Sequence, residues 1–513
     1  MSKRAIVRRQ GVLIEISVDG QVPLSKAVVK KLAEPLEYTH RQYLKGQAAY
    51  DESGSHEAHV KLEHRRLYHF DGEGRFCCLR GFLSRLTEIL HGLGYAVDLI
   101  DKNPPVSPEI YRANWDRVFE LFTFRPQQDV CLAQIDMHDG GVIDAVPAFG
   151  KTHMMGMICA LYPKAKIDII TEGKDNVNSL ITKLMQWIPG VGQMGCGKKR
   201  HGRVTVYSAD SLHHSDYTAN IVLADEVHTL MTDQRVEKLA RYPCARMFGF
   251  TATTDTRFDN AHVRMEGLCG PVIFRMLYSE AVSHDLVVPI SVQWFGCTMD
   301  CNPCSTLRDD TARKRHGIWR NSTRNKIIAD TAMEMFNEGH QVLVLVETVE
   351  HGLHLHQLLP DFQLCYSEAA LSDAEKRQKF INWGILDPTT PALSAAGRDT
   401  MRRAFERREF LGAIATGVWS TGVSFDSLEV LWRADGGASA TASVQSPGRV
   451  CRIEESIGKR VGLVFDSIDY FDDNFRRKSQ ERRYAYAKQE WTQIMPDGSI
   501  WVPGTRGTYR ASL

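Results

Sequence analysis

The feature that most constrains the fold is a repeated alternation of short apolar segments with amphipathic ones. Over residues 109–285, apolar runs of strand length alternate with stretches whose apolar residues have helical spacing. These runs are 141–146, 166–170, 204–207, 221–224 and 247–250. The alternation predicts βαβ units that build a mostly parallel sheet.

A second series of the same kind spans residues 286–470, with apolar runs at 341–347, 412–416 and 462–466. We therefore expect an α/β fold with two parallel sheets in tandem, each flanked by helices. A chain of 513 residues is long enough to give each sheet its own core.

The two ends of the chain depart from this pattern. Residues 1–105 contain strand patterns at 12–18, 62–70 and 95–100 and a helical pattern at 82–93, which predict a small α+β accessory domain. A proline-rich linker at 103–108 follows it. Residues 471–513 are expected to form a C-terminal extension that opens with a charged helix.

Composition limits the possible partners and compartments. The net charge of +1 shows no global basic bias, so nucleic acid would have to bind local basic surfaces. The 12 cysteines follow no regular framework, which favours reduced thiols in a cytosol. We find no signal-peptide pattern and no apolar run of about 18 residues, and therefore expect no membrane span and a cytoplasmic location.

The segment 145–152 reads Ala-Val-Pro-Ala-Phe-Gly-Lys-Thr and lies between a predicted strand and an apolar helix. There the backbone and the helix N-terminus can surround the phosphates of ATP. Lys151 is expected to neutralise the β- and γ-phosphates, and Thr152 to ligate Mg²⁺. The loop that surrounds the phosphates consists of Pro147, Ala148, Phe149 and Gly150.

One substitution in this segment and one similar segment elsewhere bear on the prediction of a phosphate loop. Ala148 stands where the commonest form has glycine, which is tolerable if its φ stays negative. Residues 192–199 form a second Gly-rich, Lys-containing segment, but without the hydroxyl residue and the apolar helix. We therefore expect 192–199 to be a surface loop.

Two carboxylates follow the apolar run 221–224, and a strand tip presents such groups to a crevice. Asp225 is expected to hold Mg²⁺ through water, and Glu226 to position and deprotonate the attacking water. An isolated acidic pair is more often a solvated loop, but its place after the phosphate loop favours a site. His228, with Thr251 and Thr253, is expected to couple hydrolysis to movement.

Arg125 and Gln128 precede the phosphate loop. The Gln128 carboxamide can pair with both donor and acceptor edges of adenine, which would favour ATP. An ordinary turn at a helix N-terminus is the alternative interpretation.

The second series carries three polar residues, Gln445, Arg449 and Arg452, whose spacing predicts one face of a helix. Two guanidiniums on one face repel each other unless an anion lies between them. The γ-phosphate of ATP is such an anion, so both arginines are candidate catalytic groups. A loop upstream is expected to offer hydroxyl and backbone groups to phosphates and includes Ser420, Thr421, Gly422 and Asp426.

These motifs, in this order, resemble superfamily 2 helicases of the DEAD/DEAH-related kind, and are most like bacteriophage UvsW-type recombination helicases. The resemblance is carried by residues 125–128, 145–152, 225–228, 251–253, 420–424 and 445–452. It implies two RecA-like domains, ATP and Mg²⁺ as cofactors, and ATP-driven translocation on single-stranded, duplex or branched DNA. The same resemblance implies that the protein remodels or unwinds branched DNA, such as forks and Holliday junctions, in recombination, repair or replication. Departures are Ala148 for glycine and Val227 for the family's more usual cysteine, and neither removes a reacting group.

Two other functions remain open on the sequence alone: an RNA helicase, and an ATP-dependent nucleic-acid-binding switch that does not translocate. The intact candidate residues Glu226, Arg449 and Arg452 argue against a switch. The location would be the host cytoplasm if the chain is viral. No protein partner is predicted.

Cys297, Cys301 and Cys304 could hold zinc or an iron–sulfur cluster with a fourth ligand such as His316. Because no second cysteine pair follows, we favour free thiols.

The charged helix predicted at 474–491 mixes arginines with aromatic residues. It suits either nucleic-acid contacts or packing on the protein with a solvated basic face. Six arginines are expected to be spare cations for phosphates: Arg65, Arg66, Arg476, Arg477, Arg482 and Arg483.

Overall fold

The computed structural model describes residues 3–18, 24–43, 60–243, 245–252, 262–367, 369–390, 392–419, 425–437 and 447–502. They belong to two compact units, Met1–Met276 and Leu277–Leu513. Every helix within these ranges is too short or too polar to cross a lipid bilayer.

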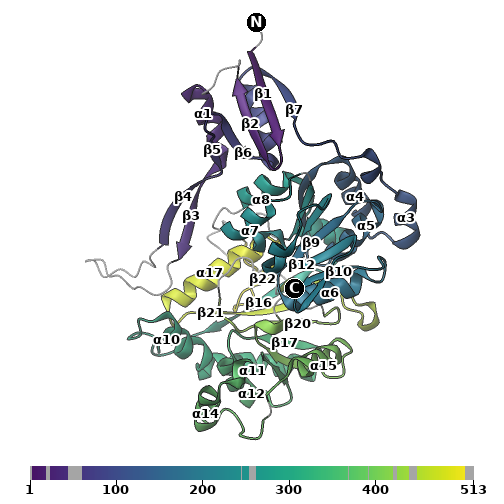
Figure 1. Cartoon of the computed structure of the whole chain (residues 1–513). Coiled ribbons are helices and arrows are strands. Elements are labelled where there is room, and N and C mark those ends of the chain that lie inside the picture. Colours follow the sequence, from purple (N-terminus) through teal and green to yellow (C-terminus); the bar gives the residue numbers. More distant parts are fainter. Residues whose placement is uncertain are drawn as a thin grey trace. The chain divides into compact units, whose positions relative to one another are not determined.

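The first unit begins with a five-stranded sheet of order β5-β6-β2-β1-β7 (Figure 1). Its strands are β1 (Lys3–Gln10), β2 (Leu13–Val18), β5 (Tyr68–Phe70), β6 (Phe76–Leu79) and β7 (Tyr95–Asp101). Two helices, α1 (Lys26–Ala33) and α2 (Leu83–Gly92), share one apolar core with the sheet. The α+β character expected for this region is confirmed.

The prediction of a single strand at 62–70 is wrong. Strand β4 (Val60–Arg66) pairs instead with β3 (Glu37–Tyr43) in a separate two-stranded ribbon. Leu67 packs against the core of the five-stranded sheet, and the chain then enters β5. Both halves alternate polar and apolar residues, so the pattern alone does not reveal the break.

The second sheet of this unit has eight strands in the order β11-β10-β12-β9-β13-β14-β8-β15. All neighbours are parallel except β10 and β11. The strands are β8 (Gly140–Ala145), β9 (Ile167–Thr171), β10 (Gly192–Gly195), β11 (Lys198–Arg200), β12 (Val204–Ser208), β13 (Ile221–Ala224), β14 (Arg246–Thr251) and β15 (Val272–Met276). The central strands β9 and β13 are buried throughout, because helices cover both faces of a parallel sheet.

The helices of this region are α3 (Trp115–Leu121), α4 (Gln128–Met137), α5 (Lys151–Leu161), α6 (Lys174–Leu184), α7 (Asp233–Leu239) and α8 (His262–Cys269). The prediction of a surface loop at residues 192–199 is wrong. These residues form the antiparallel β10–β11 hairpin, because Gly195, Cys196 and Gly197 all adopt positive φ and turn the chain back on itself.

The second unit contains a seven-stranded parallel sheet of order β18-β19-β17-β20-β21-β16-β22. Its strands are β16 (Ile290–Cys297), β17 (Val342–Leu345), β18 (Gln363–Cys365), β19 (Gly412–Ala415), β20 (Val430–Arg433), β21 (Gly462–Asp469) and β22 (Thr492–Ile494). Its helices are α9 (Tyr278–Ser283), α10 (Asp310–Lys314), α11 (Ser322–Asn337), α12 (Val349–Leu358), α13 (Ala369–Ser372), α14 (Ala374–Asn382), α15 (Ala395–Glu406) and α17 (Asp473–Ala487).

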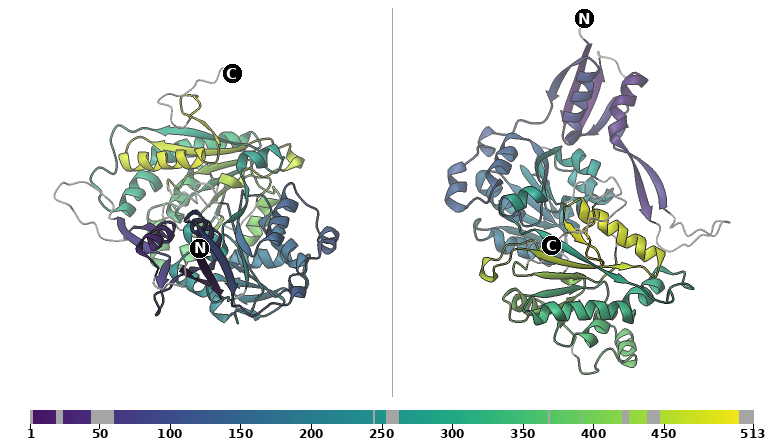
Figure 2. Two further views of the ribbon diagram at one scale, coloured as in Figure 1. Left: turned by 90° about the horizontal axis from the view of Figure 1, so that it is seen from above. Right: turned by 180° about the vertical axis from the view of Figure 1, so that it is seen from behind.

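The segment expected to be a C-terminal extension is built into this second sheet. Strand β22 is an edge strand that pairs in parallel with β16. Helix α17, drawn in yellow in Figure 2, packs against β21. Both sheets therefore have the helix-flanked parallel architecture that the strand–helix alternation predicts.

Candidate nucleotide site

The phosphate-loop segment lies where the sequence places it, between β8 and the first turn of α5. Gly150 caps α5 with φ 92°, and a Cβ there would meet Gln128 Nε2 at 2.7 Å. Glycine is therefore required for two reasons, backbone conformation and space. The first N–H groups of α5 have no carbonyl partner within the helix, as is usual at a helix N-terminus, and are available to an anion.

The expectation that Ala148 keeps a negative φ is wrong. Its φ is 74°, in the left-handed region that favours glycine. For an alanine this conformation costs roughly 1–2 kcal/mol. The loop holds it because neighbouring groups bind it: Arg125 Nη1 donates a hydrogen bond to the Ala148 carbonyl at 3.2 Å, and the Phe149 side chain is buried and stacks on Phe274.

The two halves of the predicted nucleotide site meet directly. Lys151 Nζ donates to Glu226 Oε1 at 2.5 Å, although the two residues are 75 positions apart in the chain. Their side chains are 15% and 30% exposed, so solvent screens the pair only in part. Glu226 has φ 44°, a strained conformation that in proteins is concentrated at functional sites.

Asp225 lies beside Glu226 at the end of β13. Thr171 Oγ1 donates a hydrogen bond to Asp225 Oδ2 at 3.0 Å. Burial, and next the negative charge of Glu226, raise the pKa of the Asp225 carboxyl above its ordinary value. A bound cation would oppose both effects, and the oxygen donors of Asp225 and Thr152 are the type that Mg²⁺ prefers.

His228 connects the acidic strand tip to the next strand. Its Nδ1 lies 3.0 Å from Thr251 Oγ1 at the end of β14 and 3.5 Å from Glu226 Oε2. Glu226 Oε2 itself is buried and accepts no hydrogen bond from the residues that the structure describes, so it has capacity to hold a water molecule. The predicted link from His228 to Thr251 is present, whereas Thr253 lies outside the described residues.

Gln128 is fully buried and holds the phosphate loop from behind. Its Nε2 donates to the Phe149 carbonyl at 2.7 Å, and its Oε1 accepts from the Arg125 backbone N–H at 3.0 Å. His153, which no sequence pattern singled out, places Nδ1 3.1 Å from Gln128 Oε1. The adenine contact of Gln128 stays a prediction, and the structure adds a loop-supporting role that the sequence did not suggest.

In the second unit, Arg449 ends a short 3₁₀ turn, Pro447–Arg449. The expected helix face through Arg452 is not found in the described part of this segment, which turns and then becomes irregular after Arg449. Pro447 and Gly448 explain the difference, since neither residue type supports a helix interior. Gln445, like Ser420, Thr421 and Gly422, lies outside the described residues.

The arginine segment, defined here as residues 447–452, carries two guanidiniums that influence each other. Burial, and next the neighbouring Arg452, lower the pKa of Arg449 to about 9. Arg452 Nη1 donates to Asp426 Oδ1 at 2.8 Å, and Lys459 Nζ donates to the Asp426 carbonyl at 3.1 Å. Burial lowers the pKa of Lys459 to about 8. Arg452 and Lys459 thus share Asp426 as a partner, and the charge of Glu429 also acts on Lys459. Lys459 was not singled out by the sequence because it lies beyond the motif.

The three cysteines at the end of β16 have different environments. Cys297 and Cys304 are buried, and burial raises the pKa of each thiol to about 11. Cys304 Sγ donates to the Arg313 carbonyl at 3.3 Å, whereas Cys301 is exposed. Among the described residues no group of three or more His, Cys, Asp or Glu side chains is arranged to hold a metal ion. The choice between thiols and a metal site stays a prediction.

Two of the expected spare cations are not spare. Arg482 is 0% exposed and pairs with Asp466, and Arg65 pairs with Asp233 at 3.0 Å. Arg66, by contrast, is 64% exposed, with its Nε 3.4 Å from a Glu37 oxygen. The local sequence offers Arg65 one partner, Glu63, at 2.8 Å, but the carboxylates Asp233 and Asp466 that meet Arg65 and Arg482 lie farther along the chain.

Comparisons with known proteins identify the fold but no family. No protein-family model matches the sequence, and no curated protein matches it. The structure is similar to a fragment of a putative HsdR subunit of a type I restriction enzyme from Vibrio vulnificus YJ016, with TM-score 0.52 and 13% identity, covering 94% of this chain and 100% of that chain. T4 UvsW aligns over 96% of this chain and 99% of that chain, with TM-score 0.39 and 14% identity.

Dbp5 from S. cerevisiae, bound to RNA and ADP BeF3, aligns with TM-score 0.49 and 13% identity over 76% of this chain and 94% of that chain. Identities this low carry information on fold alone. With the two helix-flanked parallel sheets, the HsdR similarity confirms the predicted class: two tandem RecA-like domains with a small N-terminal α+β region and a C-terminal extension.

Proposed function

We propose that this protein is an ATP-dependent DNA helicase or translocase that remodels branched DNA. The observation that carries the proposal is the contact between Lys151 of the phosphate loop and Glu226 of the acidic strand tip, at 2.5 Å. An ATPase needs a phosphate-binding cation and a water-activating carboxylate within reach of the same phosphoryl group. This pair supplies both, at the edge of the sheet where the parallel strands end.

The roles within this site follow from the groups present. The N-terminus of α5 and Lys151 bind the β- and γ-phosphates. Thr152 and Asp225 hold Mg²⁺, directly or through water, and the metal offsets phosphate charge when it is bound. Glu226 orients the attacking water and accepts its proton, for which its buried Oε2 has a free acceptor position. His228 and Thr251 couple the ATP-bound state of the site to the ends of β13 and β14.

Arg449 and Arg452 are proposed to stabilise the γ-phosphoryl group in the transition state. The proposal is supported by the proximity of the two guanidiniums, because burial and the charge of Arg452 lower the pKa of Arg449 to about 9 and an anion would relieve this repulsion. An arginine that meets the phosphate only in the reactive arrangement lowers the barrier without strengthening ground-state binding. Alternate binding and release of ATP would then change the arrangement of the two RecA-like domains and move the strand.

DNA as the partner is supported by the motif resemblance and by the fold shared with a restriction-enzyme fragment. An RNA helicase and a non-translocating switch are the alternatives. We further propose that the region 1–105 and helix α17 influence substrate choice through their exposed arginines Arg66, Arg476 and Arg477. Deletion of 1–105 would be a poor test, since a Cβ at Gly81 would meet the Glu266 carbonyl at 1.9 Å, which shows how tightly this region packs on α8.

The decisive experiment measures phosphate release by the full chain alone and with single-stranded DNA, duplex DNA, forked DNA or RNA of equal length. We expect stimulation by DNA, greatest with forked DNA. Stimulation by RNA alone would replace the proposal with an RNA helicase. ATP-dependent DNA binding without turnover would indicate the switch. Displacement of a labelled strand from the fork, measured in parallel, separates a helicase from an ATPase that does not unwind.

A further inference from the structure

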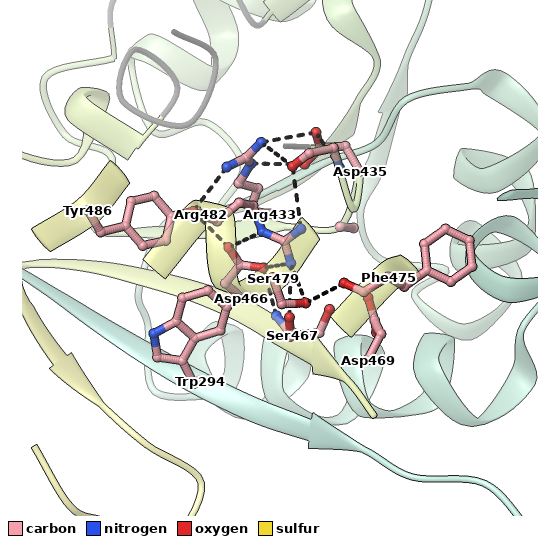
Figure 3. Close-up of polar contacts among 12 residues, drawn as sticks. Trp294, Arg433, Asp435, Asp466, Ser467, Asp469, Phe475, Ser479, Arg482 and Tyr486 are labelled. Atoms are coloured by element: carbon pink, nitrogen blue, oxygen red, sulfur yellow. Dashed lines mark hydrogen bonds and ion pairs between the residues drawn. The ribbon is translucent and has the colours of Figure 1, made fainter. Parts of the chain in front are cut away.

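Helix α17 is anchored by a buried charged network as well as by buried apolar residues such as Phe475 (Figure 3). Arg482 donates from Nε and Nη2 to the two Asp466 carboxylate oxygens, both at 2.9 Å. The Tyr486 hydroxyl donates to Asp466 Oδ2 at 2.7 Å. All three side chains are fully buried. A buried ion pair is maintained only when its remaining hydrogen-bonding capacity is satisfied, and Tyr486 meets part of that need.

The same network reaches the end of β20. Arg433 Nη1 donates to the Tyr486 hydroxyl at 3.1 Å, and Arg433 Nε donates to Asp435 Oδ1 at 3.0 Å. The Gly437 carbonyl accepts from Arg433 Nη2 at 2.9 Å and from Arg482 Nη1 at 3.4 Å. The two guanidiniums and two carboxylates balance in charge. Gly437 is the last described residue before the chain continues to the arginine segment.

A second route joins α17 to the arginine segment through aromatic rings. The Tyr486 ring stacks on Trp491 with centroids 5.4 Å apart, and Trp491 meets the Tyr278 ring edge-on at 6.0 Å. The Tyr278 hydroxyl donates to the Val288 carbonyl at 2.9 Å. The Val288 N–H in turn donates to the Cys451 carbonyl at 2.7 Å. Cys451 lies between the two proposed catalytic arginines, so Tyr486 belongs to both routes.

We infer that Tyr486 is a positioning residue for the arginine segment, an inference that rests on the proposed ATPase function. Its hydroxyl fixes Arg433 and Asp466, and its ring supports the path to the Cys451 backbone. A buried polar network whose groups are satisfied is rigid, and it holds the backbone segments that it joins in one arrangement. The C-terminal helix thereby controls the rate of hydrolysis in addition to any contact that its exposed face makes.

The test is Tyr486→Phe, which removes the hydroxyl and keeps the ring. We expect kcat for ATP to fall about 10-fold, as happens when a group that orients a functional side chain is lost. Binding of a fluorescent ATP analogue should be unchanged, because Lys151 and its loop are untouched. Tyr484→Phe is the matched control, since Tyr484 lies on the same helix but is 57% exposed and should leave kcat unchanged.

A second variant protects the test against general destabilisation. Trp491→Phe weakens the aromatic route, which Tyr486→Phe leaves intact because it keeps the ring, so Trp491→Phe should lower kcat by itself with nucleotide binding unchanged. Unchanged kcat in Tyr486→Phe would overturn the inference. Equal losses of kcat and nucleotide affinity with a lower melting temperature would also overturn it, as a structural effect only. Absence of ATP hydrolysis by the wild-type chain would instead reject the proposed function.

Discussion

Glu226→Gln should have opposite effects on ATP binding and ATP turnover. Without nucleotide, Glu226 Oε1 holds Lys151 Nζ at 2.5 Å, so this contact must be given up before Lys151 can bind phosphate. A charge-assisted hydrogen bond contributes about 1.5–3 kcal/mol net, and the partial exposure of Glu226 reduces this toward about 1 kcal/mol. At 1.4 kcal/mol for each factor of ten, the variant should bind ATP about fivefold more tightly.

Turnover should fall in the same variant, because the amide cannot accept the proton of the attacking water. Loss of a general base typically costs about 10²–10⁴-fold in rate. The assays are titration with a fluorescent ATP analogue and phosphate release, each at two salt concentrations. Salt should reduce the gain in affinity in part, since the pair is partly exposed to solvent.

Two comparison variants make this result interpretable. Lys151→Ala should lose turnover and also bind ATP more weakly, because the phosphates lose their cation. Glu237→Gln removes an exposed carboxylate of α7 that pairs with Arg241 at the surface, and should change neither property. If Glu226→Gln turned over ATP at the wild-type rate, or bound it as weakly as Lys151→Ala, the assigned roles would be wrong.

Four further outcomes are expected. Ala148→Gly should raise stability by about 0.5–1 kcal/mol in thermal unfolding, because glycine relieves the left-handed strain at some entropic cost, whereas Gly150→Ala should be destabilising. Arg449→Ala should lower kcat by as much as about 10³-fold with little change in ATP affinity, and equal losses would place it in the resting pocket. The pKa of Lys459 is lowered from 10.5 to about 8 in the folded state, so the folded protein releases this proton at a lower pH than the unfolded chain does. The free energy of unfolding should therefore rise between about pH 8 and 10.5, by at most about 3 kcal/mol. Denaturant titrations across this pH range should show that Lys459→Met abolishes the rise. Elemental analysis should find no stoichiometric zinc or iron, and metal that is lost in Cys301→Ser would contradict the preference for thiols.

The sequence by itself determined most of the elements of the two parallel sheets and their order. Strands such as β8 and β13 are recognisable because a parallel strand covered on both faces must be a short continuous apolar run. The phosphate loop and the acidic strand tip follow from the need for a cation, a metal ligand and a base in one site. Their approach to one another was also predictable, since the strands of a parallel sheet end at a common edge.

Only the tertiary structure decided which polar groups are neutralised and by what. Helix α17 has a sequence typical of an exposed basic helix, yet Arg482 is 0% exposed because Asp466 of β21 meets it. Arg65 is likewise occupied by Asp233, 168 positions away. A local sequence pattern shows only how polar and apolar residues alternate. Whether a guanidinium is paired and buried, or exposed to solvent, depends on a partner that folding brings close to it.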